Sequence, residues 1–210
     1  MKRDEPTEGW LRGALRPLSS IDAGWLQEWL PTNAVQRLLG HAAEQRRHAS
    51  RLVTRQLQAQ GEQPLWGQGD DAPPWLAESA PTQQALATLL GAMACSPWLR
   101  SAVARESVAQ LVGALGNDGY RFALAERDLQ VQGLAPFEGQ RIGPHLMAIG
   151  AALLEINLRR CVPATRFRLR LILPPAVWRA RSQALVADED VVSAAISRAL
   201  VVAKKAQPPC

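Results

Sequence analysis

The sequence has few of the residues that build disulfide frameworks, metal centres and membrane spans. Its 210 residues include three histidines and three cysteines, Cys95, Cys161 and Cys210. An odd number of widely spaced cysteines without a CxxC pair argues against a disulfide framework and indicates a reducing compartment. The most apolar stretch, residues 146–154, has about half the length needed to span a bilayer, and the charged residues 1–10 do not resemble a secretory signal. We therefore expect a cytoplasmic protein.

The motifs of common enzyme classes are also missing, since the sequence has no phosphate-binding GxxxxGK loop, no GxGxxG, no GxSxG and no HExxH. One spacing is metal-like: His41, Glu44 and His48 share a face of a candidate helix. The two histidines are two turns apart, roughly 10 Å, which is too far to share one ion directly. We expect a surface cluster there, and no catalytic, cofactor-binding or metal-binding residues. An enzyme of unrecognised type built on these three residues is the remaining alternative.

The positive charge is concentrated near one end of the sequence. The formal net charge is +5, but residues 1–158 hold 14 basic and 16 acidic residues. Residues 159–210 hold ten basic and three acidic residues, a local charge of +7. Seven arginines and no acidic residue lie within 159–181. Such a segment suits an acidic or phosphate-bearing partner, or is a solvated face without a specific partner.

Apolar residues recur at helical spacing along most of the chain. The candidate helices cover residues 19–31, 32–61, 80–95, 97–116, 117–129, 142–160 and 188–206. The uncharged stretch 146–154 indicates the central helix of the core. Residues 61–82 are dense in Gly, Pro and Asp, so we expect a long loop there. The sequence predicts a mainly α single domain over 19–206, with flexible ends at 1–18 and 207–210.

The stretch RFRLRLILPP, residues 166–175, alternates arginines with apolar residues. A period of two is typical of a half-buried strand, and Pro174 and Pro175 would end it. LQVQGL, residues 129–134, alternates in the same way and is its best local partner. The sequence therefore predicts a small two-stranded β element, about 129–134 and 166–173, in an otherwise helical domain.

Two groups of residues are candidates for binding a protein partner. The first contains arginines in and before the expected strand, and the second contains four of the seven tryptophans, a residue type enriched at interfaces. They are Arg159, Arg160, Arg166, Arg168, Arg170, Trp25, Trp29, Trp66 and Trp75. The arginines have two other interpretations, a solvated edge that resists aggregation and a nucleic-acid-binding or regulatory segment within 159–181. Core packing is an equal alternative for the tryptophans.

Three stretches together carry a family resemblance. They are LLGAMACSPWLRSAVARESVAQLVGALGNDGYRFAL, then RIGPHLMAIGAALLEINL, then RFRLRLILP followed by Trp178. Their order, the IGP turn before a small-residue helix and the Arg/Leu strand closing at Pro174 resemble the SctK proteins of bacterial type III secretion, which include YscK, PscK and their Hrp counterparts. The resemblance covers roughly residues 85–178.

The resemblance implies a non-enzymatic adaptor without a cofactor. SctK proteins belong to the cytoplasmic sorting platform of the injectisome, where they link the cytoplasmic domain of the inner-membrane ring protein SctD to the SctQ pods. The pods carry the SctL spokes and the SctN ATPase. The chain would then lie at the cytoplasmic face of the bacterial inner membrane, held there by SctD-like and SctQ-like partners and connected to SctL and SctN only indirectly. A small-molecule substrate and nucleic acid would not be among its partners.

Overall fold

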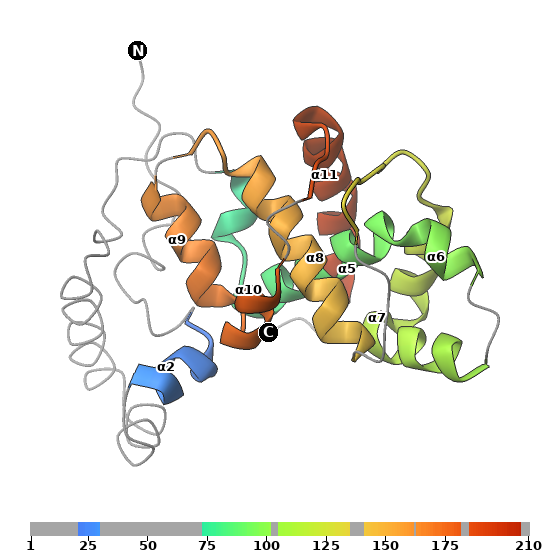
Figure 1. The fold of residues 1–210 in the computed structure, drawn as a ribbon, viewed down its shortest axis with the longest axis horizontal. Coiled ribbons are helices and arrows are strands. Elements are labelled where there is room, and N and C mark those ends of the chain that lie inside the picture. The colour runs from blue at the N-terminus through green and yellow to red at the C-terminus, as the bar shows by residue number, and fades with distance from the viewer. Residues whose placement is uncertain are drawn as a thin grey trace. The chain divides into compact units, whose positions relative to one another are not determined.

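The structure is a computed structural model, and it describes residues 21–29, 73–101, 105–134, 141–161, 163–181 and 185–206. These residues are mainly helical (Figure 1), as the sequence predicts. The helices are α2 (Ala23–Trp29), the 3-10 helix η2 (Pro74–Ala77), α5 (Ala80–Ala94), α6 (Ser96–Ser101), α7 (Arg105–Ala125), α8 (Ile142–Asn157), α9 (Pro163–Ile172), α10 (Pro175–Ala180) and α11 (Glu189–Lys205). The helix expected over 32–61, most of the 61–82 loop and the expected flexible ends lie outside the described residues.

The contacts of the chain gather in two compact units. The first combines Met1–Ala80 with Arg160–Pro175, and the second combines Pro81–Arg159 with Ala176–Cys210. Each unit is therefore assembled from two separate stretches of sequence. The expected boundary at residue 18 falls outside the described residues, and the other lies at residue 206, the last one described; both stay predictions.

In the first unit, α2 meets the carboxyl end of α9. The indole N–H of Trp25 donates to the carbonyls of Arg170 and Leu173, each over 2.9 Å. The backbone N–H of Asp22 donates to the carbonyl of Leu171 over 2.7 Å. The last carbonyls of a helix have no partner within the helix, so α2 supplies donors that α9 needs. The Trp25 ring is buried, and the Arg170 guanidinium lies 4.9 Å from its centroid.

The expected strand over 166–173 is wrong, because these residues form helix α9. Arg and Leu are good helix formers, and no β-branched residue lies between 166 and 171 to favour a strand. Pro163 occupies the first helical position, where its missing N–H costs nothing. The buried residues Thr165, Leu169 and Ile172 follow helical spacing. Leu171 and Leu173 are buried as well, so the carboxyl end of α9 is buried on more than one side.

The other half of the expected β element, residues 129–134, is not a strand either. Among the described residues it forms one isolated antiparallel bridge, between Gln132 and Val186. Both backbone hydrogen bonds of this pair are present, at 3.0 and 3.2 Å. Gly133 has a φ of 79°, which turns the chain immediately after Gln132. The alternation in this segment therefore produces a short extended stretch without a sheet.

In the second unit, α8 is the central helix, as its uncharged sequence predicts. Residues 148–154 are all buried, and α7 and α11 both pack on it. Two glycines allow α5 to approach its backbone closely. A methyl group on Gly91 of α5 would lie 1.8 Å from the carbonyl oxygen of Leu146, and one on Gly150 of α8 would lie 1.7 Å from that of Ala87. Only glycine fits at either position.

The expected division between the helices 97–116 and 117–129 is present, because the backbone of α7 is non-helical at Gly116, with a φ of 71° and a ψ of 167°, and two helices meet there. The first of them differs from its expected bounds, since it begins at Arg105 and residues 96–101 form the separate helix α6. The short helix α10 was not expected at all. Helix α11 begins as predicted, and the Asp188 side chain caps it by accepting from two backbone N–H groups. Within the described part of the chain, none of the helices has the length and hydropathy of a membrane span.

Candidate functional site

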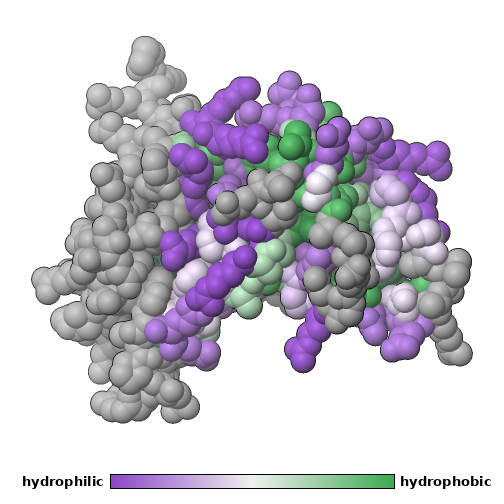
Figure 2. All heavy atoms as spheres, in the orientation of Figure 1, coloured by the Kyte–Doolittle hydropathy of each residue, from purple (hydrophilic) through white to green (hydrophobic). Residues whose placement is uncertain are grey.

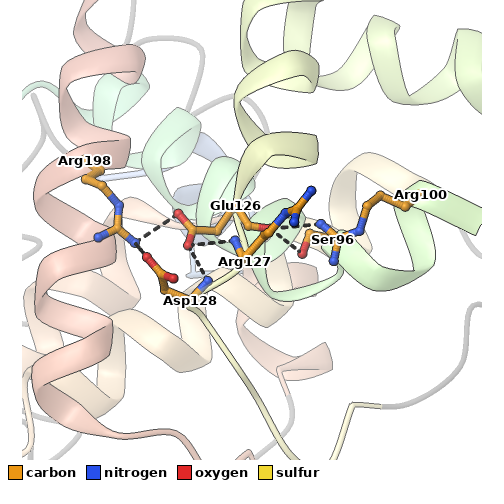
Figure 3. Close-up of polar contacts among 6 residues, drawn as sticks. All are labelled: Ser96, Arg100, Glu126, Arg127, Asp128 and Arg198. Carbon is orange, nitrogen blue, oxygen red and sulfur yellow. Dashed lines mark hydrogen bonds and ion pairs between the residues drawn. The ribbon is translucent and has the colours of Figure 1, made fainter.

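A polar cluster lies at the end of α7 (Figure 3). The buried carboxylate of Glu126 accepts hydrogen bonds from the backbone N–H groups of Arg127, at 3.1 Å, and Asp128, at 2.8 Å. Its other oxygen accepts from the guanidinium of Arg198 on α11, at 3.0 Å. The carboxylate therefore joins the end of α7 to α11 and fixes the direction in which the chain leaves α7.

The backbone carbonyl of Glu126 belongs to the same cluster. It accepts from the Ser96 hydroxyl over 3.1 Å and from the Arg100 guanidinium over 2.9 Å. Arg100 also donates to the carbonyl of Leu124 over 3.2 Å. These contacts satisfy carbonyls at the end of α7 and bind α6 to it. The Ser96 hydroxyl thus contacts the residue that follows α7, although Ser96 itself begins α6.

The charge of Glu126 is stabilised by these donors. Burial raises the pKa of the carboxyl, but the Asp128 N–H and the Arg198 guanidinium outweigh it and hold the pKa below its ordinary value of 4.5. Arg198 also lies 3.8 Å from the exposed carboxylate of Asp128. A carboxylate that is ionised and hydrogen-bonded at neutral pH is a poor general acid or base there. The cluster is therefore suited to holding the chain in place rather than to proton transfer.

Beside this cluster lies a groove of about 500 Å³. One wall comes from the junction of α5 and α6, and the other from the segment that leaves α7. The lining residues are Ala94, Cys95, Ser96, Pro97, Trp98, Arg100, Arg127, Leu129, Gln130, Val131 and Leu134. Most of the lining is apolar, and its charged members are both arginines. Figure 2 shows hydrophobic residues at the surface of the second unit among hydrophilic ones.

Cys95 lines this groove but is not suited to be a nucleophile. The residue is buried, and burial raises the pKa of its thiol to about 12. Only the thiolate is strongly nucleophilic, and almost none is present at neutral pH. The groove is therefore suited to binding rather than to covalent chemistry at this sulfur.

The arginines nominated from the sequence do not form one exposed row. Arg159 and Arg160 are exposed at the end of α8, whereas Arg166 and Arg170 on α9 are half-buried. The Arg170 guanidinium packs on Trp25, and the buried Nε atom of Arg166 has no hydrogen-bond partner among the described residues. The side chain of Arg168 lies outside the described residues. Their predicted contact with a partner stays a prediction.

Trp25 and Trp75 are both buried within the first unit, each with about 2% of its surface exposed. This gives them a packing role, and their predicted role at an interface stays untested. Trp66 and the side chain of Trp29 lie outside the described residues. His41, Glu44 and His48 also lie outside them. Among the residues that are described, no group of three potential metal ligands comes together.

The groove-lining residues were not nominated from the sequence. Arg100 and Arg127 are isolated arginines without a pattern, and Leu129 and Val131 were assigned to a strand. The one available signal was the LQVQGL alternation directly after a charged helix end, which marks an extended segment but not a groove. Comparisons with protein-family models, with curated proteins and with solved structures found no match.

Proposed function

We propose that this protein is a non-enzymatic adaptor of a type III secretion sorting platform, linking an SctD-like inner-membrane ring protein to an SctQ-like pod protein. The observation that supports it is the resemblance of residues 85–178 to the SctK family, taken with the position of the groove. Every groove-lining residue, from Ala94 to Leu134, falls inside that stretch. The proposal places the chain in the cytoplasm, held at the inner membrane by its partners.

The residues of α9 support this proposal through their sequence alone. The residues RFRLRLILP still resemble the family in sequence, but the closing strand no longer counts as shared structure, because these residues are helical. The remaining support is the sequence of α5 to α8 and the small-residue character of α8. Gly150 of α8 packs on the backbone of α5, so part of the resembling sequence encodes a specific helix crossing.

The test is direct binding to the two proposed partners. The purified protein is run by size-exclusion chromatography with light scattering, alone and mixed with the SctQ-like protein or the SctD-like cytoplasmic domain of the same bacterium. A mixed peak with either partner supports the adaptor function. Separate peaks with both partners, at low and moderate salt, would reject it.

The structure sharpens the choice of arginines for mutation. Reversing Arg170 would disturb its packing on Trp25, so a loss of binding would be ambiguous. The exposed pair Arg159 and Arg160 is the better target, and the double change R159E/R160E should weaken binding mainly at low salt. R121E is the matched control, since Arg121 is an exposed arginine on α7. Equal effects of the two variants would show that charge, rather than this surface, determines affinity.

The alternative function is nucleic-acid binding by the arginine-rich segment 159–181. Arg170 and Arg181 of this segment are engaged within their own units: Arg170 packs on Trp25, and Arg181 contacts Glu155 at 2.7 Å and lies over the Trp178 ring at 3.6 Å. This engagement favours the adaptor proposal. Titration with labelled single- and double-stranded DNA at low salt distinguishes the two, because phosphate binding is strongest there.

A further inference from the structure

We propose that the groove between the α5–α6 junction and residues 127–134 binds an extended, acidic segment of a protein partner, which adds as a short strand to the backbone at Val131–Gly133. The proposal names one docking site of the adaptor, and it rests on the proposed function only for the identity of the partner. Three features carry it: unpaired backbone groups, an apolar lining and two arginines.

The orientation of the backbone groups next to Gln132 is determined by its bridge to Val186. The N–H and C=O of Gln132 both point at Val186, with which they are hydrogen-bonded. Peptide groups are planar and, among the described residues, trans, so the C=O of Val131 and the N–H of Gly133 point the opposite way. Neither has a hydrogen-bond partner among the described residues. They form a short open edge of the kind to which extended peptides add.

The groove borders this segment at Val131, whereas Gln132 and Gly133 are not among its lining residues. Gln130, Val131 and Leu134 line it, whereas Val186 and its neighbours do not. The side chains of Val131 and Leu134 are half-buried, so each still offers apolar surface. In a strand, alternate side chains point to the same face. Every second side chain of an added segment can therefore contact this apolar wall.

The charge of the groove selects an acidic segment. Arg100 and Arg127 are exposed, and the lining has no acidic residue. Two donors of Arg100 are held by the carbonyls of Leu124 and Glu126, which orient its guanidinium at the groove. The Arg127 side chain has no polar partner among the described residues. Its backbone N–H is fixed to the Glu126 carboxylate over 3.1 Å, which holds the residue at the groove wall.

Nearby acids do not neutralise these two arginines. The Glu126 carboxylate is buried against Arg198, and that of Asp128 lies 3.8 Å from the same guanidinium. A nucleic acid would satisfy the charges but would not pair with the backbone edge or bury apolar side chains. A protein segment with alternating apolar and acidic residues satisfies all three features, so we commit to this occupant.

The test uses the full chain, labelled with ¹⁵N, and three synthetic peptides. The first is acetyl-Glu-Val-Glu-Leu-Asp-Val-amide, the second replaces every acid by lysine, and the third is the first peptide N-methylated at alternate backbone nitrogens. We expect the first peptide to shift the amide signals of Val131 and Gly133. The lysine peptide should not bind, and N-methylation should weaken binding because it removes strand donors.

Variants locate the contact. R127E and L134E should each weaken binding of the acidic peptide by about tenfold or more, while R121E on the exposed face of α7 should change it less than about twofold. Retained amide dispersion confirms that each variant is folded. Equal binding of the lysine peptide, unchanged binding by R127E, or signal changes confined to other residues would overturn the proposal. Concentration-dependent broadening of the same amides without peptide would do so as well, because it would assign the groove to a second copy of the chain.

The same variants separate this inference from the proposed function. SctQ-like and SctD-like proteins are tested against R127E and L134E beside the peptide. Peptide binding without binding of either protein supports the groove and contradicts the adaptor function. Binding of a partner protein that R127E and L134E leave unchanged supports the adaptor function and overturns the groove as its docking site.

Discussion

Glu126, at the end of α7, accepts a hydrogen bond from Arg198 of α11, 72 residues later in the chain. The carboxylate is buried, whereas the arginine is 40% exposed along its side chain. Such a pair is more costly to break than a surface pair, because removal of one partner leaves the other poorly satisfied. Glu126 also lies directly before the segment that forms one wall of the groove, so loss of this ion pair should also disturb the position of that wall.

We expect E126Q to lower the free energy of unfolding by about 1.5–3 kcal/mol, the range for hydrogen bonds to charged groups. Urea denaturation followed by circular dichroism measures it. D128N is the control, since Asp128 is largely exposed and lies 3.8 Å from Arg198; we expect less than about 0.5 kcal/mol there. Equal losses in the two variants would show that burial of Glu126 does not matter.

The contribution of Glu126 should depend on pH. Its pKa in the folded chain lies below the ordinary value of 4.5, through donors that outweigh the effect of burial. The stabilisation is then fully present above the unfolded pKa and is lost as pH falls through the folded pKa. The stability difference between wild type and E126Q should be constant from pH 6 to 8 and shrink below about pH 4. A difference that grows on acidification would contradict this assignment.

Gly91 and Gly113 should respond to the same substitution in opposite directions. G91A places a methyl group 1.8 Å from the Leu146 carbonyl oxygen, so α5 and α8 must separate. We expect a loss of about 3 kcal/mol, the upper range for overpacking. A methyl group on Gly113 of α7 meets no atom within 4 Å, so G113A should stabilise the chain by about 0.5–1 kcal/mol through helix propensity. Thermal denaturation of both variants checks the pair of signs, and a tolerated G91A would contradict the close crossing.

W25F should destabilise the first unit although it keeps an aromatic ring. The substitution removes the indole N–H that donates to the carbonyls of Arg170 and Leu173. One buried and one partly buried carbonyl lose this donor, so we expect a cost of about 1–3 kcal/mol. W178F is the comparison, because Trp178 is half-exposed and stacks with Arg181; its expected cost is about 0.5–1 kcal/mol. Circular dichroism is the readout, since both changes alter fluorescence directly.

Cys95 should resist alkylation in the folded chain. With a pKa of about 12, only about one thiol in ten thousand is ionised at pH 8. In a C161S/C210S background, iodoacetamide should modify Cys95 at least about a hundred times faster in denaturant than in buffer. Mass spectrometry follows the reaction. Rapid alkylation of Cys95 in the folded chain would mean that this part of the groove opens to solvent.

The sequence was most informative where apolar residues were dense. The spacing of Leu86, Leu89, Leu90 and Met93 predicts that they are buried, and all four are, within a stretch of α5 that is buried on every side from residue 86 to 94. The acids at the start of 188–206 likewise favour a helix start there, and α11 begins at Glu189. These signals are local, so they need no knowledge of the partner elements.

The prediction of a strand was wrong because spacing and helix propensity favour different structures for the same residues. Arginines and leucines at alternate positions over 166–171 suit a strand by spacing and a helix by propensity, and packing against α2 decided between them. The groove was invisible for a different reason. Its walls are about 30 residues apart in sequence, and they meet because the backbone carbonyl of Glu126 accepts from Ser96 and Arg100. No sequence pattern reports a hydrogen bond to a backbone carbonyl at that distance.

The contact between Trp25 and Arg170 also has a consequence for synthesis of the chain. The two residues are 145 positions apart, and α9 belongs to the same unit as the N-terminal residues. At about 5–20 residues per second, a ribosome needs roughly 7–30 s to travel between them. During that interval the nascent α2 has no α9 to cover the Trp25 ring. Helix α2 is thus made early, but its packing on α9 can form only after most of the chain has been synthesised.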